Sequence, residues 1–69
     1  MEIPNEVKLQ LLNNEVVSHK QAVYVLSIRH RVNKKLGHTP EQLKALEEDI
    51  AKSEMAIDEL EKVIKELDG

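Results

Sequence analysis

Apolar residues recur at steps of three and four through the second half of the chain, with only Ser53 at a position where a further apolar residue is expected. This spacing is a heptad pattern, in which the a and d positions of one helix face a partner helix. Charged residues fill the intervening positions, and Glu48 and Lys52 are spaced as a favourable pair on a helix surface. The pattern predicts one long helix whose seam consists of Leu43, Leu46, Ile50, Ile57, Leu60, Ile64 and Leu67.

The first half of the chain carries two apolar stripes, whereas a helix in a simple hairpin needs only one. No glycine or proline interrupts residues 6–36, so we expect one long helix there. At about 100° per residue, the first stripe consists of Val7, Leu11, Ser18, Ala22, Val25, Val32 and Leu36. The second lies roughly a third of a turn away and consists of Leu9, Leu12, Val16, His19, Val23, Leu26 and His30. One stripe packs on the second helix and the other on a symmetry mate; we assign the second stripe to the oligomer interface.

Local signals mark both ends of the first helix. Pro4 suits the first turn of a helix, and Asn5 is a candidate N-cap. Gly37 suits the left-handed position that ends a helix, directly after a basic last turn. These signals predict a helix over about 5–36.

The segment Thr39-Pro40-Glu41-Gln42 predicts the start of a second helix. The Thr39 hydroxyl and the Gln42 side chain are spaced as a capping box, and the intervening proline suits the first helical position. We therefore expect a turn over 37–39 and a helix over about 40–67. So short a connection makes the two helices antiparallel neighbours, so residues 1–69 form one all-α helical-hairpin domain.

The small size of the chain predicts self-association. A hairpin of 69 residues buries little surface, and the chain has no cysteine to staple it. Residues 1–38 are basic and residues 39–69 are acidic, within a net charge of -3, so the halves are electrostatically complementary. We expect a coiled-coil-like homo-oligomer, either a dimeric four-helix bundle or a larger helical assembly, enlarged where Val17 and Ile28 extend the apolar surface.

A ribbon of polar residues follows the remaining arc of the first helix. It contains three cations, a hydroxyl and the single aromatic ring of the chain, groups that suit a phosphate-bearing ligand with a base to stack. The alternative is an ordinary solvated face, with the long cationic side chains lying along the ring. The candidate ligand-binding residues are Lys20, Tyr24, Ser27, Arg31 and Lys34.

The histidines predict no metal site. His19 and His30 are eleven residues apart, about 16 Å along a helix, which is too far for both to ligate one metal ion within a chain. We expect no cofactor. A further hypothesis is a pH switch, in which protonation of an interfacial imidazole below about pH 6.5 weakens assembly.

The function that the sequence favours is recognition of another macromolecule, as an adaptor, inhibitor or assembly factor. No nucleophile with a positioned base, phosphate loop or metal motif is present, so we do not expect an enzyme. The acidic balance disfavours nucleic acid as a partner, and no apolar run approaches the length of a membrane span. The absence of cysteine fits a cytoplasmic protein. The alternative hypothesis is an oligomer that sequesters an anionic small ligand, such as a nucleotide, in cationic clefts between subunits, by analogy with inhibitors encoded by mobile genetic elements.

Overall fold

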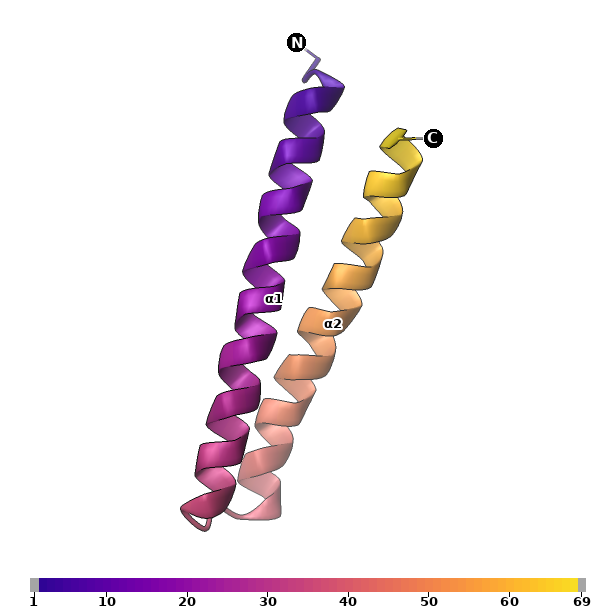
Figure 1. Cartoon of the computed structure of the whole chain (residues 1–69). Coiled ribbons are helices and arrows are strands. Elements are labelled where there is room, and N and C mark those ends of the chain that lie inside the picture. Colours follow the sequence, from indigo (N-terminus) through magenta and orange to yellow (C-terminus); the bar gives the residue numbers. More distant parts are fainter. Residues whose placement is uncertain (1, 69) are drawn as a thin grey trace.

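The computed structural model describes residues 2–68 and consists of two long helices joined by a tight turn (Figure 1). α1 spans Asn5–Lys35 and α2 spans Pro40–Asp68. The helices run antiparallel and side by side, which gives an elongated molecule measuring 51 × 20 × 14 Å. The predicted all-α antiparallel hairpin is confirmed. Neither helix is long and apolar enough to cross a membrane, over the residues that the structure describes.

The start of α1 differs from the prediction. Pro4 occupies the cap position with φ −59° and ψ 148°, and its carbonyl oxygen accepts hydrogen bonds from the backbone N–H groups of Val7 and Lys8, both at 3.0 Å. Asn5 is already helical, so its predicted role as the N-cap is wrong. A cap position requires extended backbone, which the proline ring favours. No side chain caps this end of α1.

The end of α1 is closed by a glycine motif, as the sequence predicts. Gly37 has φ +87°, in the left-handed region. Its N–H donates to the carbonyl oxygen of Lys34 at 3.2 Å, and the N–H of His38 donates to that of Asn33 at 3.0 Å. These two bonds form a Schellman motif, which satisfies carbonyl groups that the helix leaves free.

The start of α2 is the predicted capping box. The N–H of Gln42 donates to Thr39 Oγ1 at 3.3 Å, and the N–H of Thr39 donates to Gln42 Oε1 at 2.9 Å. Two backbone donors at the helix start are thereby satisfied reciprocally. The two motifs stand next to each other in the chain, so α1 ends and α2 begins within four residues, 36–39.

The core of the hairpin is one layer of side chains between the two helices. α2 contributes its predicted heptad positions, which are all half-buried. Ser53 lies among them and is also half-buried. The contribution of α1 is the second stripe, of which Val16 is the one buried residue in the described part of the chain, with 7% of its surface exposed. The rest of that stripe is half-buried, at Leu9, Leu12, His19, Val23, Leu26 and His30.

This placement bears on the predicted oligomer interface. The second stripe, which we assigned to contacts between copies, lies between α1 and α2 of one chain. The first stripe is exposed at every position except the half-buried Ala22. α2 has a single apolar seam and covers one stripe of α1, so the other stripe is left uncovered in the hairpin. A contact of the second stripe with another copy stays a prediction.

Candidate functional site

The predicted ligand-binding residues lie on one flank of α1. Because α1 is unbroken, steps of three and four residues keep them in a single line along the helix. Tyr24, the single aromatic residue of the chain, is 62% exposed and can therefore be reached by a ligand. The ribbon, all of it exposed, consists of Lys20, Tyr24, Ser27, Arg31 and Lys34.

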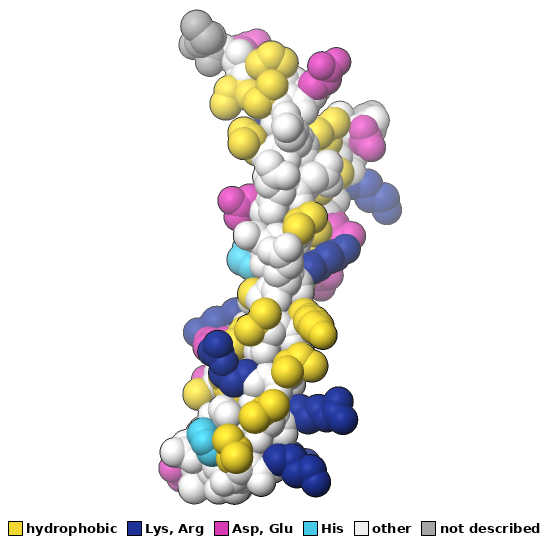
Figure 2. All heavy atoms as spheres, turned by 60° about the vertical axis from the view of Figure 1, so that its left-hand side comes forward, with side chains coloured by type: hydrophobic (Ala, Val, Ile, Leu, Met, Phe, Trp, Pro, Cys, Tyr) yellow, Lys and Arg dark blue, Asp and Glu magenta, His cyan; other side chains and the backbone are white. Residues whose placement is uncertain are grey.

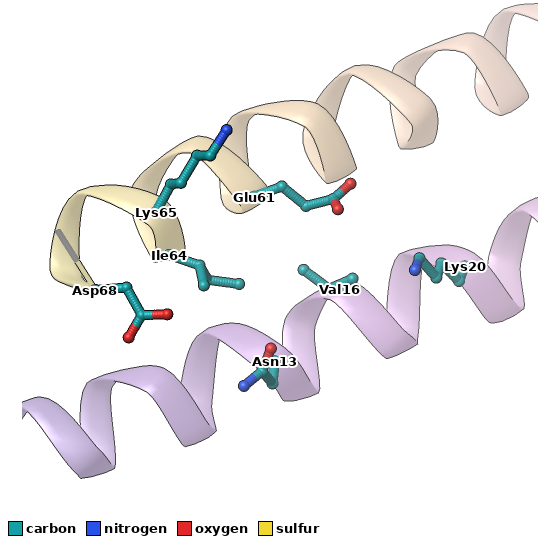
Figure 3. A pocket seen from close by; sticks show the side chains of 7 residues that line it. All are labelled: Asn13, Val16, Lys20, Glu61, Ile64, Lys65 and Asp68. Atoms are coloured by element: carbon teal, nitrogen blue, oxygen red, sulfur yellow. The ribbon is translucent and has the colours of Figure 1, made fainter.

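The ribbon borders three shallow hollows in the surface. The hollow nearest the open end of the hairpin has a volume of about 420 Å³ and a floor of Val16 and Ile64, whose side chains point toward each other (Figure 3). Lys20 comes to it from α1, and carboxylates come from α2 at Glu61 and Asp68. The second hollow, nearer the turn, is lined by Ser27, His30, Lys34, Glu47 and Ile50.

The third hollow differs from the others in its charge. It is lined by Arg31, Lys34 and Lys35 and has no carboxylate in its wall. In Figure 2, which shows the outer side of α1, the Lys and Arg side chains gather toward the turn end of the molecule. Carboxylates of α2 line the hollows beside Lys20 and Ser27, whereas the hollow beside Arg31 is lined by cations alone.

Few of the charged groups are paired. Across residues 2–68, the ion pair between side chains is Lys62 with Glu59, at 3.3 Å, and the His30 imidazole lies 3.1 Å from the Glu47 carboxylate. Neither involves a cation of the ribbon. The Lys20, Arg31 and Lys34 head groups are thus not held by a carboxylate of the described chain, and the structure leaves them available to an anion.

The contact of His30 with Glu47 joins the two helices. His30 Nε2 lies 3.1 Å from Glu47 Oε2, and the His30 side chain is 27% exposed. Glu47 is one of the charged residues between the seam positions, which the heptad pattern places on the solvated face of α2. Its place next to the seam residue Leu46 was the signal that could have predicted this contact with α1.

A second surface of α1 is apolar. Large apolar side chains are exposed along the length of the helix (Figure 2), whereas on α2 the exposed ones are Met55 and Val63. At the open end, a further hollow between the helices is lined by Lys8, Leu11, Leu12, Val63 and Leu67. The exposed apolar residues of α1 are Val7, Leu11, Val17, Tyr24, Val25, Ile28 and Val32.

No group of three or more histidine, aspartate or glutamate residues is arranged to hold a metal ion within 2–68. The chain matches no family model, no curated protein and no solved structure. α1 thus presents two surfaces, the ribbon and the exposed apolar face.

Proposed function

We propose that this protein is a non-enzymatic helical binding protein of the cytoplasm. It forms an oligomer of hairpins and recognises another macromolecule, as an adaptor, an inhibitor or an assembly factor. The observation that supports this proposal is the exposed apolar face of α1, since soluble helices normally cover such a face.

Affinity purification from the cell that makes the protein tests this function. We expect a different macromolecule to be enriched with the tagged wild-type chain and lost with Val17→Glu, which places a charge on the apolar face. Met55→Glu is the matched control, because Met55 is also apolar and exposed but lies on α2. Enrichment of nothing except the chain itself, relative to an untagged strain, contradicts the proposal.

A second candidate function is capture of an anionic small ligand, such as a nucleotide, in cationic clefts between subunits. The specific observation in its favour is the hollow lined by three cations and no carboxylate, on the same flank as the exposed ring of Tyr24. Phosphate oxygens bind to arginine and lysine, and a base stacks on an aromatic face.

Native mass spectrometry of the gently purified protein distinguishes the two functions. A captured ligand adds a few hundred daltons per site, and Arg31→Ala should abolish this extra mass without changing the oligomer or its helicity. Lys44→Ala, a charge removal on α2, should retain it. A clean multiple of the chain mass for the wild type counts against ligand capture and in favour of a macromolecular partner.

A further inference from the structure

α1 carries a second heptad repeat on the side turned away from α2. Its a positions are Leu11, Ser18, Val25 and Val32, and its d positions are Val7, Asn14, Gln21 and Ile28. All eight residues, which we call the outer seam, are exposed. By helix geometry, the outer seam lies about 150° around the axis of α1 from the second stripe, which faces α2. This angle is about the same at both ends of the helix. Five of the eight residues are apolar, and the three in the middle, Asn14, Ser18 and Gln21, are uncharged and polar. The a and d spacing is that of a coiled coil, and this line has no partner in the hairpin.

The charge pattern separates the outer seam from an ordinary solvated surface. None of these eight residues is charged, although 33% of the chain is; the next d position, Lys35 in the last turn of α1, is charged. The corresponding outward line of α2 is charged at every position but one, and consists of Glu41, Lys44, Glu48, Lys52, Met55, Glu59, Lys62 and Glu66. Desolvation costs more for charged groups than for the apolar and uncharged polar residues of the outer seam, so a partner is expected on α1 and not on α2.

The exposed area is sufficient for such a partner. The hairpin exposes 5683 Å². A compact monomer of the same mass exposes about 4,400 Å², so the excess is about 1,300 Å², compared with about 800 Å² per partner in a standard interface. With Val16 as its one buried described residue, the hairpin gains a second apolar layer by pairing.

The polar residues of the outer seam favour a parallel arrangement. In register, Asn14 lies opposite the partner's Asn14, and amide groups meet amide groups in the middle of the seam. The flanking positions then set Gln10 beside the partner's Glu15 and Tyr24 beside the partner's Arg29. Like charges meet where the repeat reaches the last turn of α1, at Lys35. An antiparallel pairing that matches the apolar ends sets Asn14 against the partner's Val25, and Lys8 near the partner's Arg29.

We propose that a second copy of the chain docks on the outer seam, α1 against α1, parallel and in register. This inference rests on the oligomeric part of the proposed function and names the surface that performs it. The ribbon lies beside the outer seam, so pairing leaves the ribbon of each copy at the margin of the interface.

The mass in solution is the first test. We expect light scattering after size exclusion to give a multiple of 7.9 kDa for the wild type and for Met55→Glu, and the mass of one chain for Val25→Glu. Circular dichroism follows the helicity of each variant. A wild-type chain that is monomeric at about 100 µM, or equal masses for the two glutamate variants, overturns the proposal.

Cysteine cross-linking is the second test, and it uses a conservative change that the fold tolerates. The chain has no cysteine, so a single introduced thiol bonds only to its counterpart in another copy. A disulfide requires Cα atoms about 4.4–6.8 Å apart. Under mild oxidation, Val32→Cys should give a covalent dimer in high yield and Met55→Cys should not. In the antiparallel pairing the two copies of residue 32 lie about 37 Å apart, so failure of Val32→Cys to cross-link overturns the parallel arrangement.

The two proposals fail separately. A chain that forms the cross-linked dimer but enriches no other macromolecule keeps the outer-seam interface and loses the proposed function. A chain that enriches a macromolecule while remaining monomeric keeps a binding function and loses the interface.

Discussion

Val16 and Val17 are adjacent valines in opposite environments. Val16 points between the helices and is 7% exposed, whereas Val17 is 52% exposed on the far side of α1. Equal chemistry at neighbouring positions makes this pair a direct measure of what burial contributes to the hairpin.

We expect Val16→Ala to lower the free energy of unfolding by about 1–2 kcal/mol, because two buried methyl groups and their contacts are lost. Val17→Ala should change it by less than about 0.5 kcal/mol. Urea unfolding followed by circular dichroism, at one protein concentration, provides the comparison. Equal effects of the two substitutions would show that the seam between α1 and α2 does not hold the hairpin together.

At this scale, the sequence predicted the residues whose role is local. Gly37 and the Thr39–Gln42 pair form the motifs that their spacing indicates, because turn and cap geometry depends on a few neighbouring residues. It did not predict Pro4 as the cap position of α1, nor the hydrogen bond of Glu47 with His30. The latter depends on the register between two helices, which no local pattern specifies.

The elements of the hairpin are defined at the turn, where one helix ends in a Schellman motif and the next begins in a capping box. Loss of the Thr39 hydroxyl leaves the Gln42 N–H without its acceptor. We expect Thr39→Ala to lower the free energy of unfolding by about 1 kcal/mol, and Thr39→Ser to restore most of it. Chemical denaturation of both variants beside the wild type measures this. A serine variant as unstable as the alanine variant would mean that the cap bond contributes nothing.

The ends of both helices lie within a residue of the predicted positions. The sequence pattern did not specify which of the two apolar stripes of α1 packs on α2. Hydrophobic periodicity states which residues share a face; it does not state what covers that face. Both stripes of α1 fit α2 by period alone. Within one chain, the structure buries Val16 between the two helices and leaves Val25 exposed.

The whole molecule is long and thin, and its stability as one chain depends on a single layer of contacts. If copies pair through the outer seam, folding and association are coupled, and the melting temperature rises with protein concentration. We expect such a rise for the wild type between about 5 and 500 µM and none for Val25→Glu, in thermal melts followed by circular dichroism. A wild-type melting temperature that is independent of concentration contradicts coupled association.

The short connection between the helices also decides the order in which contacts form and break. Contacts near the turn close loops of few residues, whereas Leu12 and Leu67, at the open end, join parts of the chain far apart in sequence. Folding that starts at the turn therefore adds one layer at a time toward the open end. A force applied to the two ends of the hairpin separates the same layers in the reverse order, so mechanical resistance at any moment comes from a single pair of facing turns.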